Sequence, residues 1–598
     1  MEQRQKARSE IEEKYKWDLT PIYKDVDSWY EDYDLVSKEI KKVLDFKGNI
    51  VKSAKNLLDY IEFSMNLERK LYKLYYYAHL NFDSDTTNNE YQKMNGKIEN
   101  LLAEYNKLDS FANPEMMKID YNQIKEFYKE EPRLQEYEFL LEQLYRYKDH
   151  ILNTEAESII SSFANINSTP EQVFEALTDS DLRFGKVKND KGEDVELTES
   201  NYSSFIESTN RDVRKEAFEM LLKTYSNYKN TIANTFAGNV EVLTTMAKLK
   251  KYSSSLEASL FDDNISTGVY NNLIDTVSNN LNVLYKYFDL KKEVLGLDEF
   301  HLYDQYNSLV PDCSKNYTFE EAKDLVLKAL TVLGEDYVAN LNKAFDERWI
   351  DVYNNKGKRT GAYSSGFYDT NPYVLLNFNG KFGDVSTLAH ELGHSMHTYY
   401  SFHNNPYQYS SYKIFVAEVA STVNELLLKY YILNHTDDVN EKKYIINEMM
   451  NNFKSTIYRQ TMFAEFERDM HALKEKGEVL TSQLLSDKYY ELNKKYFGPN
   501  VVVDDVIRYE WERIPHFYYD FYVYKYAIGL SCACYIADGI LNNKPNALEN
   551  YKKFLSSGGS DYPANELKIA SIDVTKSEVV ESAIKMFDNL IKQFKELS

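Results

Sequence analysis

The chain has 598 residues, of which 43% are hydrophobic and 28% are charged, a composition typical of a folded protein with two or more domain-sized units. Its 71 basic and 94 acidic residues give a net charge of −23. An acidic surface repels phosphate backbones and anionic lipid, so we expect neither nucleic acid nor a membrane as a partner.

The cysteines and the apolar segments of the sequence indicate in which cellular compartment the protein is found. The three cysteines, Cys313, Cys532 and Cys534, form neither a C-x-x-C pair nor a disulfide framework, which fits a reducing environment. The charged N-terminus, MEQRQKARSEIEEKYKWDLT, lacks the apolar centre of a signal peptide. The most apolar late stretch, residues 527–541, is shorter than the ~18–20 residues that span a bilayer. We therefore expect a soluble, cytoplasmic protein.

Most of the chain is predicted to be helical, because apolar residues recur at spacings of three and four and only 11 prolines and 20 glycines interrupt them. Thr20 followed by Pro21 has the form of a helix start. Residues 182–198 break the pattern, since two strand-like runs flank an Asn-Asp-Lys-Gly turn, which predicts a β-hairpin. We place a domain boundary there, between an N-terminal helical lobe (1–195) and a catalytic lobe (196–598).

A second break covers residues 356–383, which are rich in Gly, Ser, Asn and Tyr. Within it, residues 373–378 are predicted to form a short strand. The small sheet expected here directly precedes the segment 384–397, DVSTLAHELGHSMH, which is the most informative part of the chain.

This segment contains an H-E-x-x-H motif, with His390 and His394 four residues apart. If Asp384 or Ser386 caps a helix here, the two imidazoles lie on one face, one turn apart, and can share a zinc ion at ~2.0–2.1 Å. Glu391 is rotated about the axis, where it can act as a general base on a water activated by the metal.

The alternative is an ordinary helix that carries surface histidines. Four of the ten histidines, His390, His394, His397 and His403, fall within fourteen residues, which favours a metal site. His397 would crowd the same short helix as a third ligand. We interpret it either as a group beside the ligands or the substrate, or as a purely structural residue.

The predicted helix at 412–433 offers a better third ligand. Glu418 and Glu425 lie seven residues apart on one face, among apolar or small neighbours, where an unpaired carboxylate is costly. Glu418 suits a metal ligand, and Glu425 suits an acceptor for a ligand histidine. A solvated helix face is the alternative for each.

The segment 508–526 combines a histidine with many tyrosines. If Pro515 opens a helix, then His516, Tyr519, Tyr522 and Tyr526 fall on one face at steps of three, three and four. A phenol or imidazole can stabilise the oxyanion formed during amide hydrolysis. His516 and Tyr526 are the first candidates, followed by Tyr519 and Tyr522; an aromatic core helix is the alternative.

These residues resemble the oligoendopeptidase F group of the thimet oligopeptidase family of zinc metallopeptidases. The likeness rests on HELGHSMH at 390–397, FVAEVASTVNE at 415–425 and IPHFYYDFYVYKYA at 514–527. Supporting stretches are KWDLTPIY near the start, YSSFIESTNRDVRKEAF from Tyr202, GKRTGAY from Gly357 and YRQTMFAEFE from Tyr458. The likeness therefore runs in order over nearly the whole chain.

The resemblance implies a mainly α fold with two helical lobes, a deep substrate channel and a small β-sheet next to the H-E-x-x-H helix. It implies one catalytic zinc per chain, bound by His390, His394 and Glu418, with Glu391 as general base. It also implies that His516 and a following tyrosine, Tyr519, Tyr522 or Tyr526, hold the oxyanion.

We therefore expect a zinc-dependent oligoendopeptidase that hydrolyses internal bonds of short unfolded peptides. The segment 361–379 could offer a sheet edge to an extended peptide through main-chain hydrogen bonds. Two other functions remain: a carboxypeptidase or dipeptidase on the same zinc core, and an inactive helical scaffold that binds peptides.

Overall fold

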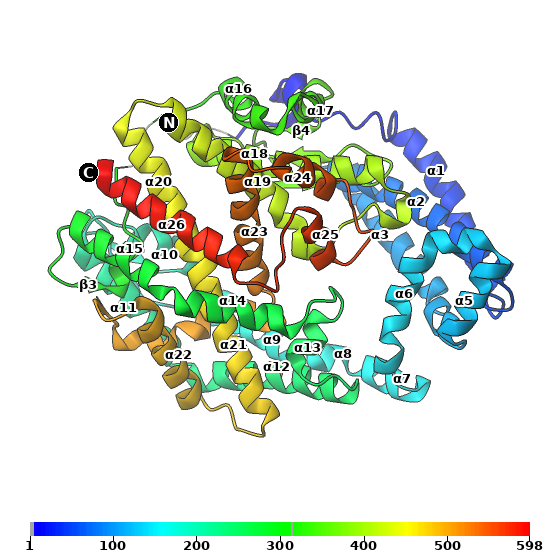
Figure 1. Cartoon of the computed structure of the whole chain (residues 1–598), viewed down its shortest axis with the longest axis horizontal. Coiled ribbons are helices and arrows are strands. Elements are labelled where there is room, and N and C mark those ends of the chain that lie inside the picture. Colours follow the sequence, from blue (N-terminus) through cyan, green and yellow to red (C-terminus); the bar gives the residue numbers. More distant parts are fainter. Residues whose placement is uncertain (1–4, 312–314, 598) are drawn as a thin grey trace. The chain divides into compact units, whose positions relative to one another are not determined.

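The computed structural model describes residues 5–311 and 315–597 (Figure 1). The chain divides into two compact units. Each unit is assembled from three separate segments of the chain. Unit 1 comprises Met1–Lys148, Ser314–Tyr431 and Ile536–Ser571, and unit 2 comprises Asp149–Cys313, Ile432–Tyr535 and Ile572–Ser598. The boundary expected at residue 195 stays a prediction.

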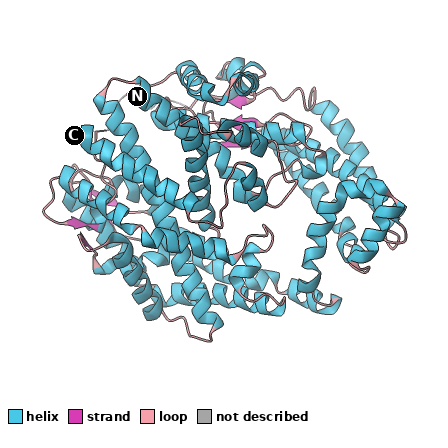
Figure 2. Cartoon of the chain, viewed as in Figure 1, coloured by secondary structure: helices cyan, strands magenta, loops and turns pink. Residues whose placement is uncertain are grey.

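The expected mainly α fold is confirmed, because helices account for most of the described chain and strands for only small patches (Figure 2). The helices that lie within unit 1 are α1 (Val26–Glu39), α2 (Ala54–Ser84), α3 (Asn89–Asp109), α4 (Ala112–Met116), α5 (Tyr121–Glu130), α6 (Glu138–Arg146), α16 (Phe319–Ala329), α17 (Glu335–Asp346), α18 (Phe382–Asn404), α24 (Ala547–Leu555) and α25 (Pro563–Ile569). Two more helices, α19 (Ile414–His435) and α23 (Tyr524–Leu541), contribute to both units.

Unit 2 holds the remaining helices and the predicted hairpin. The helices are α7 (Thr154–Ser162), α8 (Ala164–Asn167), α9 (Thr169–Glu175), α10 (Glu199–Ile206), α11 (Arg211–Ser226), α12 (Lys229–Leu249), α13 (Ser255–Leu260), α14 (Thr267–Asn279), α15 (Leu281–Val294), α20 (Val439–Phe453), α21 (Gln460–Glu475), α22 (Ser482–Phe497) and α26 (Glu578–Leu597). The hairpin is confirmed: β1 (Lys186–Lys188) pairs antiparallel with β2 (Asp194–Glu196). A second strand pair, β3 (Phe300–His301) and β7 (Val501–Val502), is parallel.

The small sheet expected before the H-E-x-x-H helix is present in unit 1. Strand β6 (Tyr373–Leu375) lies in the middle, parallel to β4 (Ile350–Asp351) and antiparallel to β5 (Tyr363–Ser365). All three residues of β6 are buried, as expected for a central strand. β5 is an edge strand that packs on α18.

Other expectations about local structure need correction or lie outside the described residues. Thr20 and Pro21 begin no helix; they form a turn in which the Thr20 hydroxyl donates to Asp18, and α1 begins later, capped by Asp25. Cys532 is buried on α23, while Cys313 lies outside the described residues. No helix among the residues described combines the length and apolarity needed to cross a bilayer.

The predicted continuous helix from Pro515 to Tyr526 is wrong. A short 3-10 helix, η12 (Pro515–Tyr518), is followed by a turn, and α23 begins only at Tyr524. Asp520 and Phe521 in this turn have φ values of +49° and +58°, which non-glycine residues adopt at a cost.

Buried Glu467 of α21 stabilises this turn. Its Oε1 accepts the backbone N–H of Phe521 at 2.7 Å, and Ser259 donates its hydroxyl to the Asp520 carbonyl at 2.8 Å. The Phe521 ring packs beside Tyr270 and His471. These contacts come from residues far away in the sequence, which is why the local pattern of aromatic residues does not predict the break.

The close approach of α18 and α19 determines the centre of unit 1. A Cβ added to Gly393 of α18 would lie 2.5 Å from Cα of Ser421 and 2.6 Å from the carbonyl oxygen of Ala420, both on α19. Asn424 of α19 donates to the Ala389 carbonyl at 3.1 Å, so the contact is also held by a buried hydrogen bond. Only glycine allows the two backbones to lie this close.

Gly393→Ala is expected to force the two helices apart. Backbone atoms cannot move aside as a flexible side chain can, so we expect a loss of about 1–3 kcal/mol, visible as a lower Tm in calorimetry. Gly383→Ala is the matched control on the same helix, because its added Cβ meets no atom within 4 Å. Equal Tm values for the two variants would contradict the described packing.

Glu467→Leu is expected to leave the buried Phe521 N–H without an acceptor, at a cost of about 1–3 kcal/mol. Glu467→Gln keeps an acceptor oxygen at the same place, and burial raises the pKa of Glu467 to about 8, so the native side chain is itself mostly neutral at pH 7. Thermal unfolding of the two variants should therefore show a lower Tm for Leu and a nearly native one for Gln. A Gln variant as unstable as Leu would count against this role.

Candidate metal centre

Helix α18 places two imidazoles side by side. The Asp384 carboxylate accepts the backbone N–H of Asn379 at 3.0 Å and of Lys381 at 2.8 Å, and so stabilises the start of the helix. His390 and His394 follow one turn apart, with ring centroids separated by 4.9 Å. Their Nε2 atoms lie 3.2 Å from each other.

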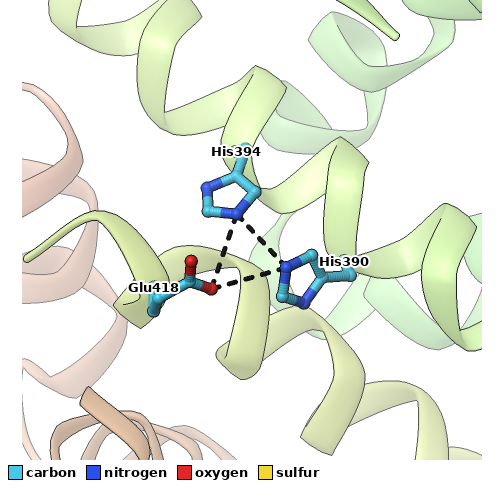
Figure 3. Close-up of side chains that lie close together, drawn as sticks. All are labelled: His390, His394 and Glu418. Carbon is cyan, nitrogen blue, oxygen red and sulfur yellow. Dashed lines mark hydrogen bonds and ion pairs between the residues drawn. The ribbon is translucent and has the colours of Figure 1, made fainter. Parts of the chain in front are cut away.

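Glu418 of α19 completes a group that could hold a metal ion (Figure 3). Its Oε2 lies 3.4 Å from Nε2 of His390 and 3.6 Å from Nε2 of His394. The Ser421 hydroxyl donates to the same oxygen at 3.1 Å. The side chain of Glu418 is 47% exposed and those of the histidines are 27% and 17% exposed, so the group is open on one side.

The carboxylate of Glu425 contacts the nitrogen of His390 that faces away from His394 and Glu418. Glu425 Oε1 is 2.7 Å from His390 Nδ1, while its Oε2 accepts from the Ser386 hydroxyl at 2.9 Å and from the Lys429 ammonium at 2.8 Å. An ionised carboxylate only accepts, so Nδ1 carries the proton and Nε2 faces the group. The contact expected from the spacing of Glu418 and Glu425 is thus observed.

The electrostatics of these residues favour a bound cation. Burial would raise the pKa of Glu425, but the charge of Lys429 and the hydrogen bond with His390 outweigh it and hold the pKa well below its usual range. Burial lowers the pKa of His390, yet the hydrogen bond and charge of Glu425 prevail and raise it. The hydrogen bond with His394 lowers the pKa of Glu418. The candidate ligand atoms of His390, His394 and Glu418 all lie within 4.8 Å of one another.

Glu391 lies beside this point without belonging to the group. It is 6% exposed, and burial raises the pKa of its carboxyl, partly offset by the charges of His390 and His394. The backbone of Ser364, on edge strand β5, forms a hydrogen bond with this carboxylate. A carboxyl group with a raised pKa is suited to accept a proton and pass it on.

His397 lies in the core of unit 1. It is 1% exposed, and its ring stacks on Tyr412 with centroids 3.7 Å apart. Burial lowers the pKa of His397 to about 3, so the ring is neutral. Of the two interpretations of this residue, the packing supports the structural one.

His516, Tyr519 and Tyr526 form a second group, in unit 2. The His516 ring lies 5.5 Å from that of Tyr519 and 6.1 Å from that of Tyr526, measured between centroids. Tyr522 is next to Tyr526, with centroids 5.3 Å apart. Although the expected helix is broken, the turn at Asp520 still brings these rings together. Burial lowers the pKa of His516, which favours the neutral imidazole.

Sequence reasoning missed three residues that support the site: Ser364, Ser386 in its role as a donor to Glu425, and Lys429. Lys429 could have been found, because it follows Glu425 by four residues on a helix, the spacing of an intrahelical ion pair. The contact of Ser364 depends on how the sheet packs against α18, for which the sequence carries no local signal.

Comparison with known proteins identifies the family. The model of peptidase family M3 matches residues 204–586, and the model of oligopeptidase F matches residues 115–184. Oligopeptidase PepF of Bacillus subtilis is 41% identical over 99% of this chain and 88% of its own length. Group B oligopeptidase PepB of Streptococcus agalactiae is 39% identical over 99% of this chain and 98% of its own.

Solved structures agree. A Chlamydophila abortus protein described as a peptidase superposes with a TM-score of 0.96 at 37% identity, covering 100% of both chains. Oligoendopeptidase-F from Enterococcus faecium gives a TM-score of 0.73 at 35% identity, covering 96% of this chain and 99% of its own. The chain therefore belongs to peptidase family M3, in its oligoendopeptidase F group, and is a peptidase.

Proposed function

We propose that this peptidase is a zinc-dependent oligoendopeptidase that hydrolyses internal bonds of short unfolded peptides. The proposal is carried by the convergence of His390, His394 and Glu418, whose ligand atoms lie 3.2, 3.4 and 3.6 Å from one another. One zinc ion per chain is expected there, in a cytoplasmic enzyme.

The spacing of the three atoms fits zinc. Two ligands that each lie about 2.0–2.1 Å from a tetrahedral ion are about 3.3–3.4 Å apart, close to all three separations. Two imidazoles and a carboxylate are also a ligand set that zinc accepts, with a fourth position left for chemistry. Glu425 would orient His390 for this task through Nδ1.

A bound metal ion would act as a Lewis acid that polarises the scissile carbonyl and lowers the pKa of the attacking water. Glu391 is the general base: it accepts a proton from the attacking water and later delivers it to the leaving amine. Its burial raises the pKa of its carboxyl, which makes the protonated form accessible for the second step.

His516, with Tyr526 or Tyr519, would donate hydrogen bonds to the oxyanion that forms on the attacked carbonyl. The proposal is supported by the grouping of these rings and by the lowered pKa of His516, which leaves a neutral N–H donor. Tyr519 is 44% exposed, so its hydroxyl is open to a substrate.

The edge strand β5 is the proposed docking line for the peptide. It stands at the end of the described sheet, where an extended main chain can pair with it, and its Ser364 contacts Glu391, so a peptide bound there would lie beside the base. Main-chain hydrogen bonds depend little on the side chains of the peptide, so we expect the enzyme to accept peptides of many sequences. Cleavage of a peptide blocked at both ends would exclude the carboxypeptidase and dipeptidase alternatives.

Glu391→Gln is expected to bind zinc as the wild type does and to lose peptidase activity by about 10²-fold or more, because the amide cannot accept the proton. The measurement is cleavage of an internally quenched, end-blocked peptide, with zinc content determined on the same preparation. Glu335→Gln, at an exposed position of α17, is the control and should keep full activity. Activity of the Glu391 variant within a few fold of wild type would rule out the general-base role.

Glu425→Gln is expected to weaken zinc binding by about 10–100-fold, because His390 loses its charged acceptor and becomes a poorer ligand. Competition with a chelator measures the affinity. Ser386→Ala removes only a neutral donor to the same carboxylate and should have a smaller effect. Unchanged affinity in the Glu425 variant would show that this carboxylate does not tune the ligand.

A further inference from the structure

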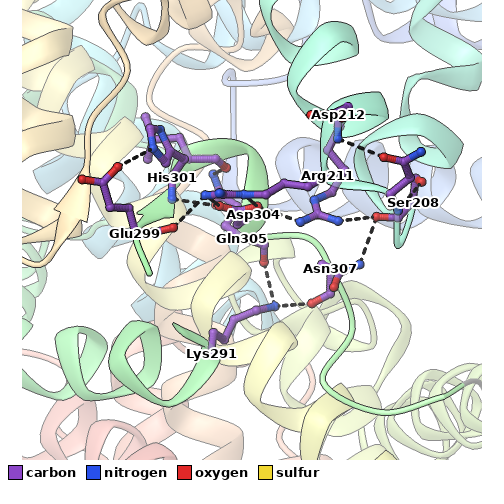
Figure 4. Close-up of polar contacts among 12 residues, drawn as sticks. Ser208, Arg211, Asp212, Lys291, Glu299, His301, Asp304, Gln305 and Asn307 are labelled. Carbon is purple, nitrogen blue, oxygen red and sulfur yellow. Dashed lines mark hydrogen bonds and ion pairs between the residues drawn. The ribbon is translucent and has the colours of Figure 1, made fainter. Parts of the chain in front are cut away.

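Unit 2 buries two lysines, Lys291 and Lys454, that have no carboxylate within ion-pair distance among the residues described. Near Lys291, Asp304 accepts from Arg211 at 2.9 Å (Figure 4). It also accepts from Arg214 at 2.7 Å. Lys291, which is fully buried on α15, donates instead to the backbone carbonyls of Gln305 at 2.9 Å and Asn307 at 2.6 Å. Among the residues described, no carboxylate lies within ion-pair distance of Lys291.

The second buried lysine contacts Tyr306, which lies between Gln305 and Asn307 in the sequence. Lys454, the first residue of the π-helix η10 (Lys454–Arg459), is 7% exposed, and its ammonium lies 4.3 Å from the ring centroid of Tyr306. In the described chain it has no carboxylate partner and no hydrogen-bond acceptor. Nearby Arg459 is neutralised by Glu510, at 2.8 Å. An ammonium buried without a partner is costly, so a partner is expected.

A small cavity adjoins this lysine. It has a volume of about 20 Å³, which is room for one water-sized guest, and Lys454, Tyr458, Arg459 and Gln305 contribute to its lining. The Tyr458 hydroxyl is buried and has no hydrogen-bond partner, so it is a donor in need of an acceptor. Apart from Tyr496, whose hydroxyl donates to Glu465, the remaining lining residues are apolar, with Phe288 and Met462 among them.

We propose that this cavity binds one chloride-sized monovalent anion, held by the Lys454 ammonium and the Tyr458 hydroxyl. The charges of Arg459 and Lys291 also act on Lys454, and that of Glu510 partly offsets them. The small volume favours a small anion, and the lysine disfavours a metal cation. Burial and the charge of Arg459 lower the pKa of Lys454, and an anion at Nζ opposes both effects.

A water molecule is the rival occupant. It could accept from Tyr458 and donate to Gln305 Oε1, which is also buried without a partner, while Lys454 stays neutral. The two occupants differ in charge, so halide dependence at constant ionic strength distinguishes them.

The first experiment uses the full-length protein in sodium gluconate, an anion too large for the cavity. Replacing gluconate stepwise by chloride or bromide at constant ionic strength should raise Tm saturably, by about 1–3 °C. Lys454→Met should abolish the rise. Lys488→Met, at an exposed position of α22, removes the same charge elsewhere in unit 2 and should keep it. A Tm that is indifferent to halide in the wild type would overturn the proposal.

Bromide crystallography tests the position of the anion and does not depend on a variant that folds. Crystals of the wild-type protein grown in sodium bromide should show one anomalous peak in the cavity, within about 3.5 Å of Nζ of Lys454. An ordinary water peak at that place, with no anomalous signal, would show that the cavity holds water only and would refute the proposal.

Discussion

The backbone contact between α18 and α19 at Gly393 is the constraint on which the candidate metal centre depends. The two histidines come from one helix and Glu418 from the other, and their ligand atoms meet beside the point where the two backbones lie closer than a Cβ would permit. Gly393 is one of the two residues between Glu391 and His394 in the motif. The H-E-x-x-H motif of this chain therefore includes the glycine that lets α18 pack closely against α19, the helix that contributes Glu418.

Electrostatic contacts then determine which nitrogen of His390 faces the other two candidate ligands. Lys429 holds Glu425 ionised, Glu425 takes the Nδ1 proton of His390, and Nε2 is left to face Glu418 and His394. This chain of contacts runs from a nearly buried ammonium to an open group of three ligand atoms. Buried charge also shapes unit 2, where Asp304 is shared by two arginines and Lys454 has no carboxylate partner within the described part of the chain.

Much of this could be predicted from the sequence, because the signals are local. The spacing of His390 and His394 within one helix, and of Glu418 and Glu425 within the next, is set by helical geometry alone, and the residues align as expected. The hairpin at 186–196 follows from its turn residues. These features need no knowledge of the rest of the fold.

Other features could not be predicted, because distant residues determine them. The helix expected after Pro515 breaks at Asp520, where Glu467 and Ser259 hold a left-handed turn that no glycine marks. His397 shares a helix with the ligands, but Tyr412 buries it in the core. The units are also assembled from interleaved segments, which a linear reading of the chain does not reveal.

The most direct test of the account is the position of the metal in crystals of the purified enzyme, determined by anomalous diffraction above and below the zinc absorption edge. The account predicts a single zinc peak within about 2.0–2.2 Å of Nε2 of His390, Nε2 of His394 and a carboxylate oxygen of Glu418. A zinc ion bound by other residues, or a peak that does not contact Glu418, would contradict it.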